Sequence, residues 1–384
     1  MLKTIFTDIE RPESLSFSPC GNYLAKCLSC KYSESDTNSI SIYSVTNRFA
    51  LVKTLLSSNN NSILNEECIV VFSPDGKYLV GSVFQGITHV WSTKDWEMVK
   101  SFDATDNNSQ VSSISFNKDG SIMAIGTELY RSDIILWNTL DWSITNRLSV
   151  QLYGANCITF NPINHNQLVS VSIEHIFNVC NISENKIVRQ IKITYDGINA
   201  ISFSRDGKYL ASGSHAGNIR IWLTEKLNLP LPNGEICQTE GYDILMKQEY
   251  GVFDLLFTID DKYLITAGGD RSIRFYSTSD WKLKKVLYRS DASIYALACS
   301  PDGNYLAAGS FDDKCSSTVW TLCKWSDRNN TYFSDNINSI VFYIMCLFEM
   351  RYFDEIPMEM LLEMIDFIPL IINLTIESVQ RSQW

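Results

Sequence analysis

The sequence predicts an all-β fold, a seven-bladed β-propeller with a small α-helical appendage at its C-terminal end. Three observations support this prediction. One pattern of apolar and polar residues recurs seven times, each copy contains three short apolar runs, and a bulky residue closes the third run in six copies. Repeats of about 40–50 residues with four strands per unit are typical of propellers.

The stretch Ile201–Trp222 is the most regular copy. Apolar residues alternate with serines up to Phe203, and the Asp206-Gly207 pair then favours a tight turn. A second apolar run follows, and a third alternating run ends at Trp222. One such unit cannot bury both of its faces, so repetition supplies the core.

The seven copies align at the end of the first run. Their spacing runs from 42 residues (Phe257 to Cys299) to 55 residues (Phe17 to Phe72). The aligned positions are Phe17, Phe72, Phe116, Phe160, Phe203, Phe257 and Cys299. The residues that close the third run are Tyr43, Trp91, Trp137, Cys180, Trp222, Tyr276 and Trp320.

These copies resemble the repeats of the WD-repeat family over residues 1–323. The family's Gly-His and Trp-Asp dipeptides are missing, but its Asp before the third strand is matched by Asp270 and Asp312. Ala216 stands at that place in the fifth copy. The resemblance implies the propeller fold. It also implies that the family's buried His–Asp network is mostly absent, which puts the stability of single blades in doubt.

The N-terminal segment Leu2–Thr7 is predicted to complete the last blade. It alternates like the stretches after Trp96 and Trp281, which should form outermost fourth strands, whereas the last repeat supplies only three strands. Pairing there would remove two open sheet edges.

Three copies share the sequences WSTKDW, WNTLDW and YSTSDW, which end at Trp96, Trp142 and Trp281. The Asp before each Trp is expected to cap the turn into the fourth strand. Because the tryptophans recur at one position, we expect them to pack between blades. An aromatic cage for methylated lysine is the functional alternative.

The composition argues against several classes of partner. The net charge is −11, which disfavours a nucleic-acid surface, since that requires clustered Lys and Arg. The first ten residues contain acids and no signal-peptide core, and no apolar run is long enough for a membrane helix. We therefore expect an intracellular protein, cytoplasmic or nuclear, with no membrane or nucleic-acid partner.

The 11 cysteines are scattered along the repeats, which favours free thiols in a reducing compartment. Cys27 and Cys30 form a Cys-x-x-Cys pair, but only Cys20 lies nearby as a further ligand. Zinc is therefore disfavoured, and no metal or cofactor is expected.

The insert Leu223–Tyr250 contains Pro230, Pro232 and Gly234. It is expected to be a surface loop and a candidate partner contact. A polar linker, residues 324–337, is expected to follow the propeller.

The C-terminal region, residues 338–384, contains two apolar stretches with helical character. The segment Ile356–Pro369 resembles the opening of an F-box, the helical module that docks substrate receptors onto cullin-type ubiquitin ligases. The matching residues that would bind the partner are Ile356, Pro357, Glu359, Leu362, Ile365 and Phe367. Two features depart from the family: the segment follows the repeats, and the spacing from Val379 to Trp384 is one residue too long.

These observations predict a non-enzymatic scaffold that binds other proteins, with a cullin-ligase adaptor as the partner that the F-box resemblance implies. One alternative is that the C-terminal helices only pack on the propeller. The alternative from another class is a propeller enzyme with a site in the central channel. It is disfavoured because the innermost runs are mostly Ser, Thr, Asn and aliphatic, and no phosphate loop, nucleophile elbow or zinc motif is present.

Overall fold

The computed structural model describes residues 3–7, 11–29, 39–56, 68–84, 86–104, 110–127, 133–149, 155–172, 176–193, 196–227, 244–289, 292–310 and 316–322. Lys3–Leu322 forms one compact unit. The second unit, Met1–Leu2 with Cys323–Trp384, lies outside the described residues.

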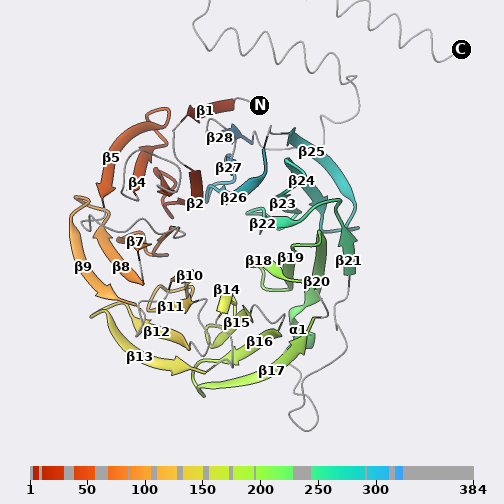
Figure 1. Cartoon of the computed structure of the whole chain (residues 1–384), viewed down its shortest axis with the longest axis horizontal. Coiled ribbons are helices and arrows are strands. Elements are labelled where there is room, and N and C mark those ends of the chain that lie inside the picture. The colour runs from red at the N-terminus through yellow and green to blue at the C-terminus, as the bar shows by residue number, and fades with distance from the viewer. Residues whose placement is uncertain are drawn as a thin grey trace, which may run out of the picture. The chain divides into compact units, whose positions relative to one another are not determined.

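Seven four-stranded antiparallel sheets stand around a central axis, and this arrangement confirms the predicted seven-bladed β-propeller (Figure 1). The first strand of each sheet lies innermost and the fourth outermost. Blade one contains β2 (Arg11–Phe17), β3 (Tyr23–Ser29), β4 (Ser39–Ser44) and β5 (Ala50–Leu56). Blade two contains β6 (Ile69–Phe72), β7 (Tyr78–Phe84), β8 (Ile87–Ser92) and β9 (Met98–Asp103). Blade three contains β10 (Val111–Phe116), β11 (Ile122–Thr127), β12 (Ile134–Asn138) and β13 (Ser143–Leu148).

Blades four to six follow the same order. Blade four contains β14 (Ala155–Phe160), β15 (Gln167–Ser172), β16 (Ile176–Asn181) and β17 (Lys186–Lys192). Blade five contains β18 (Ile198–Phe203), β19 (Tyr209–Ser214), β20 (Asn218–Leu223) and β21 (Ile244–Lys247). Blade six contains β22 (Val252–Phe257), β23 (Tyr263–Gly268), β24 (Ser272–Ser277) and β25 (Leu283–Arg289).

Blade seven is built from both ends of the propeller. It contains β26 (Ile294–Cys299), β27 (Tyr305–Ser310), β28 (Ser316–Thr321) and, as its outer strand, β1 (Lys3–Thr7). β1 pairs antiparallel with β28, from Lys3 opposite Trp320 to Thr7 opposite Ser316. Leu2–Thr7 is the segment that the sequence pattern predicts at this place.

The core lies between blades, because each sheet packs its faces against its neighbours. Middle strands are buried along their length, as β15 shows with all six residues buried. Each of the hydrophobic clusters joins two adjacent sheets. One joins blade four to blade five through Phe177 and Trp222, whose ring centroids lie 4.9 Å apart.

Turns between first and second strands repeat around the ring. A hydroxyl or amide side chain closes each turn, as where Ser204 Oγ accepts the Tyr209 amide at 2.9 Å. The third turn residue needs a positive φ, which glycine supplies at Gly207 (φ 69°). In blade six Asp261 takes this place at φ 54°. Its carboxylate accepts the Arg205 and Asp206 amides of blade five, both at 2.8 Å, which offsets the backbone strain.

The recurring tryptophans lie in the turns before the outer strands. The preceding Asp caps each turn, as where Asp95 Oδ1 accepts the Glu97 amide at 3.2 Å. Trp96 contacts Tyr23 of the preceding blade edge-on, with centroids 5.1 Å apart. Trp142 and Trp281 pack in the same way on Tyr78 and Tyr209. The predicted packing between blades is confirmed.

The insert between blades five and six is only partly loop, so the prediction of a loop throughout is wrong. Thr224–Leu227 forms the one-turn helix α1, and Ile244–Lys247 forms β21, the fourth strand of blade five. Leu227 is buried in the core between blades four and five. The three marker residues Pro230, Pro232 and Gly234 lie outside the described residues.

Candidate functional site

The beginnings of the innermost strands surround a cavity of about 430 Å³ at one mouth of the central channel. Every blade contributes one residue from the same position, four before the aligned Phe or Cys. We call these residues the mouth ring: Glu13, Cys68, Ser112, Asn156, Asn199, Phe253 and Tyr295. Two of the seven are Asn, and the other five are five different residue types.

A β-bulge places six members of the mouth ring. The pairing of first and second strands shifts register at this position in every blade except blade two, for instance between Val252 and Asp254 around Phe253. A bulge inserts one unpaired residue and re-aims its side chain. These side chains therefore line the cavity instead of following the alternation of the strand.

Polar members of the mouth ring also bond the next blade. Glu13 Oε2 accepts the Cys68 amide at 2.7 Å, and Ser112 Oγ donates to the Ala155 carbonyl at 2.5 Å. Asn199 Nδ2 donates to the Val252 carbonyl at 2.9 Å.

Serines deeper in the channel wall act in the same way. Ser14 Oγ accepts the Val70 amide at 3.2 Å, and Ser113 Oγ accepts the Ile158 amide at 3.0 Å. An innermost strand has no ladder partner on its channel side, so its backbone groups need other partners. The polar residues on these strands therefore have a structural role between blades.

Two aromatic members break this pattern. The rings of Phe253 and Tyr295, from blades six and seven, stack in parallel with centroids 4.7 Å apart and an interplanar angle of 4°. His215, exposed at the rim, lies 6.4 Å from the Phe253 ring. The mouth is consequently aromatic on one side and polar on the other.

Asp254 fixes the strands beneath this stack. Its carboxylate accepts the Leu297 amide of blade seven at 2.6 Å and the Leu255 amide at 2.8 Å. Burial of the carboxyl group raises the pKa of Asp254 to about 7, although these two hydrogen bonds lower it. The residue as a whole keeps partial exposure, so the desolvation is local to the carboxyl group.

The opposite mouth has different chemistry. Its cavity of about 340 Å³ is lined mainly by Phe160, Phe203 and Phe257, with the exposed Arg205 at the edge. Burial raises the pKa of the Cys299 thiol there to about 11, so it is not a thiolate at neutral pH.

Polar networks replace the missing His–Asp network in blades five and six. In blade six Gln248 Nε2 donates to Thr266 Oγ1 at 2.5 Å and to the Tyr276 hydroxyl at 3.1 Å. Asp270 forms an ion pair with Arg274. These side chains form a polar network in the blade that lacks the family's His–Asp pair.

In blade five the acid comes from the loop before β18. Asp196 Oδ2 pairs with Arg220 Nη1 at 2.8 Å, and both side chains are buried. Burial raises the pKa of Asp196, but hydrogen bonds from Asn218, Ser214 and Arg220 outweigh that effect and hold it below its usual value. This pair ties the loop to β20 although Ala216 occupies the family's Asp position.

The predicted repeat residues are spread around the ring and form no common site. The structure buries Trp91, Trp137, Trp222, Tyr276 and Trp320 in the contacts between blades. Asp270 lies in the turn before β24, and Asp312 lies outside the described residues. The predicted tail residues Ile356, Pro357, Glu359, Leu362, Ile365 and Phe367 also lie outside them.

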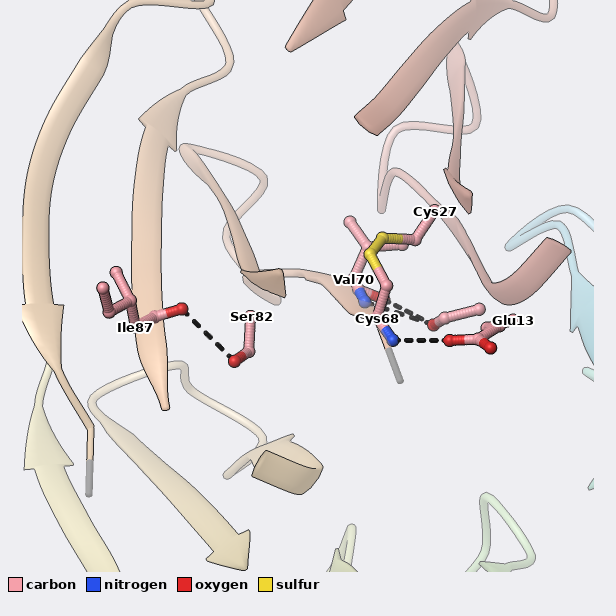
Figure 2. Close-up of a disulfide and its surroundings, with 7 residues drawn as sticks. Glu13, Cys27, Cys68, Val70, Ser82 and Ile87 are labelled. Carbon is pink, nitrogen blue, oxygen red and sulfur yellow. Dashed lines mark hydrogen bonds between the residues drawn. A yellow bond between two sulfur atoms is a disulfide. The ribbon is translucent and has the colours of Figure 1, made fainter. Parts of the chain in front are cut away.

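The prediction of free thiols is wrong for one pair. Cys27 of β3 and Cys68, just before β6, form a disulfide with Cα atoms 5.9 Å apart (Figure 2). The two are 41 residues apart in the chain and meet because blades one and two stand side by side. Figure 2 also shows Glu13 on the Cys68 amide. Among the described residues, Cys20, Cys157, Cys180 and Cys299 form no disulfide.

The mouth ring was not predicted from the sequence. Glu13, Phe253 and Tyr295 occupy one repeat position that differs from copy to copy, so an alignment of the repeats does not single them out. The sequence does show that the position four before the aligned Phe or Cys differs from copy to copy, whereas the aligned position itself is Phe in six of the seven copies.

Comparison with known proteins supports the repeat assignment. The WD40 family profile, described as "WD domain, G-beta repeat", matches residues 185–222, 244–277 and 281–316. Protein SOF1 of Saccharomyces cerevisiae is 25% identical over 248 residues, covering 60% of this chain and 46% of that protein.

Two further proteins are similar to this chain over part of their length. Intraflagellar transport protein 122 homolog of Danio rerio is 25% identical over 287 residues, covering 64% of this chain and 23% of that protein. WD repeat-containing protein AAC3 of Dictyostelium discoideum is 26% identical over 173 residues, covering 43% and 32%. The matched region spans less than half the length of each of these three relatives.

The protein is a seven-bladed β-propeller that carries WD40 repeats. WD40 propellers generally serve as scaffolds that bind other proteins. Within the described part of the chain, no helix is long and apolar enough to cross a membrane. The same residues contain no group of His, Cys, Asp and Glu able to hold a metal ion.

Proposed function

We propose that this protein is a non-enzymatic, intracellular scaffold whose mouth ring holds a partner protein. The observation that carries this proposal is the mouth ring itself. In six blades a bulge turns one side chain toward the same cavity of about 430 Å³. This volume lies within the usual range of binding pockets, roughly 300–1,000 Å³. Packing would be served as well by seven similar residues, so the variety indicates recognition.

The cavity does not favour the competing enzyme class. Its lining contains one carboxylate, that of Glu13, and no histidine. Glu13 and Ser112 bond backbone groups of the next blade, and Cys157 Sγ donates to the Asn199 carbonyl at 2.9 Å. An acid–base pair would instead need two titratable groups directed at one substrate.

Affinity purification tests the proposal. We would compare partners captured by the wild-type chain, by a Phe253→Ala, Tyr295→Ala double variant and by Arg205→Ala at the opposite mouth. The expected result is loss of the partners with the double variant and retention with Arg205→Ala. Identical partners with all three chains, each verified as folded by circular dichroism, would contradict the proposal.

A second proposal concerns the tail, and it is supported by the F-box resemblance of Ile356–Pro369. We propose that this segment docks a cullin-ligase adaptor while the propeller holds the client, so that the protein acts as a substrate receptor. Replacing Leu362 and Ile365 with Asp should then abolish adaptor binding without changing the melting temperature. A chain lacking residues 326–384 should behave in the same way.

The same variant distinguishes adaptor docking from the alternative in which the C-terminal helices only pack on the propeller. If the tail only packs on the propeller, the Leu362→Asp, Ile365→Asp variant should melt at a lower temperature. No cullin-complex subunit should then co-purify with the intact protein, under conditions where a known F-box protein captures one.

A further inference from the structure

The four mouth-ring residues of blades four to seven form a continuous arc: Asn156, Asn199, Phe253 and Tyr295. Asn156 Nδ2 donates to the Ile198 carbonyl at 3.5 Å, directly before Asn199. Asn199 Nδ2 donates to the Val252 carbonyl at 2.9 Å, directly before Phe253. The two asparagines are thus tied to the backbone beside the next member of the arc, and Phe253 stacks on Tyr295.

The amide side of the arc offers acceptors. An asparagine side chain has two donor hydrogens on nitrogen and one acceptor oxygen. One N–H of each side chain bonds the next blade, so the Oδ1 atoms of Asn156 and Asn199 supply the acceptors that the amide groups can offer to a ligand in the cavity. A ligand that donates hydrogen bonds fits this side.

The aromatic side offers a π face. Phe253 and Tyr295 stack in parallel at 4.7 Å and both are half-buried. The face of an aromatic ring attracts cations within about 6 Å of the ring centroid, and the His215 ring also lies near this pair, 6.4 Å from that of Phe253. A planar cation gains most, because it stacks while its edge stays free to donate.

The charges of the lining agree with a cationic ligand. Glu13 is the one charged residue among the lining side chains, which include no Lys, Arg or His. The whole chain carries a net charge of −11. An anionic ligand would meet π faces, amide oxygens and a carboxylate, all of which disfavour it.

We propose that the mouth ring binds an arginine side chain of the partner protein. Its guanidinium stacks on the Phe253–Tyr295 pair and donates to the amide oxygens of Asn199 and Asn156. Arginine fits better than lysine because its flat guanidinium carries five donors in a fixed fork, whereas an ammonium is a compact, strongly hydrated point charge. This inference rests on the proposed function, because it names the partner chemistry of the same site.

The test uses the full chain and acetylated, amidated tripeptides Ala-Xaa-Ala, in which Xaa is arginine, lysine, citrulline or glutamate. Citrulline has the shape of arginine without its charge. Saturation-transfer NMR at millimolar peptide should show the largest transfer to the arginine side chain, with the citrulline and glutamate peptides near background. Phe253→Leu, which keeps apolar volume and removes the π face, should weaken arginine binding roughly five- to tenfold.

Arg205→Ala, at the opposite mouth, is the matched control and should leave arginine binding unchanged. Equal binding of the arginine and citrulline peptides would overturn the inference, as would preference for glutamate, absence of any peptide binding, or full retention in Phe253→Leu. If partner capture still depends on Phe253 and Tyr295 in any of these cases, the proposed function stands and only the arginine assignment falls.

Discussion

The contacts between blades and the mouth ring use the same seven repeats in opposite ways. In the core, equivalent positions keep one character: six of the seven aligned residues at the first-strand end are Phe. At the mouth, four residues earlier, the side chains run from Glu13 through amides to Phe253 and Tyr295. Packing against a repeated neighbour demands a repeated residue, whereas recognition of one ligand demands an asymmetric surface. Under the proposed function, variation between repeats marks the binding side.

The largest expected effect is in the core. Trp222 is fully buried and contacts Phe177, so Trp222→Ala should lower the free energy of unfolding by about 3–5 kcal/mol. Chemical denaturation measures this change. Leu140→Ala is the control, because Leu140 is 89% exposed, and its effect should stay within about 0.5 kcal/mol. Equal effects of both, or quenching data that show an exposed Trp222, would contradict the comparison.

Ring closure should have the next largest effect. Deleting residues 1–8 removes β1, which pairs with β28 over the five residues Lys3–Thr7. One sheet edge then opens and backbone bonds are lost, so the melting temperature should fall by several degrees. Scanning calorimetry of the full and shortened chains measures it. An unchanged melting curve would mean that blade seven does not need its fourth strand.

The substitute network of blade six should contribute less. Gln248→Leu leaves Thr266 and the Tyr276 hydroxyl without their amide donor. The expected loss is about 1–3 kcal/mol, since buried polar groups then lose a partner. Gln248→Glu is a useful contrast, because it keeps the shape but replaces the donor. If both variants are as stable as the wild type, the network does not replace the family's His–Asp pair.

Asp254 should make stability depend on pH below neutrality. Its pKa is raised from 3.8 to about 7 by burial of the carboxyl group, so the folded state holds the proton more tightly than the unfolded state. The stability from this group is fully present below about pH 4 and is lost as the pH rises through about 7. Asp254→Asn should remove that decline, because it keeps an acceptor for Leu297. Denaturation midpoints between pH 4 and pH 8 measure it, and parallel pH profiles of both chains would refute it.

The smallest effect on stability is expected at the mouth itself. Phe253 is half-buried and belongs to no hydrophobic cluster of the described core. Phe253→Leu should therefore change the free energy of unfolding by less than about 1 kcal/mol, whereas the proposed arginine binding should weaken. A loss of stability as large as that of Trp222→Ala would show that the Phe253–Tyr295 stack contributes to the core, and would contradict the contrast between core and mouth ring.

The sequence by itself determined the fold and its packing residues. The period, the alternation and the closing aromatics predict seven blades, and they identify Trp222 and the tryptophans of the outer turns as core. They could do so because packing between identical neighbours repeats the same local pattern. Even the place of Leu2–Thr7 could be expected, since one copy lacked a fourth strand.

Only the tertiary structure decided the features that join different repeats. The bulges that direct the Glu13 and Phe253 side chains toward one cavity interrupt the alternation of apolar and polar residues on which the prediction relied. Cys27 meets Cys68, and Gln248 meets Tyr276, across stretches of chain that no local pattern connects. Such contacts depend on how closely two blades stand and on which way one unpaired residue faces, and a repeat alignment contains neither quantity.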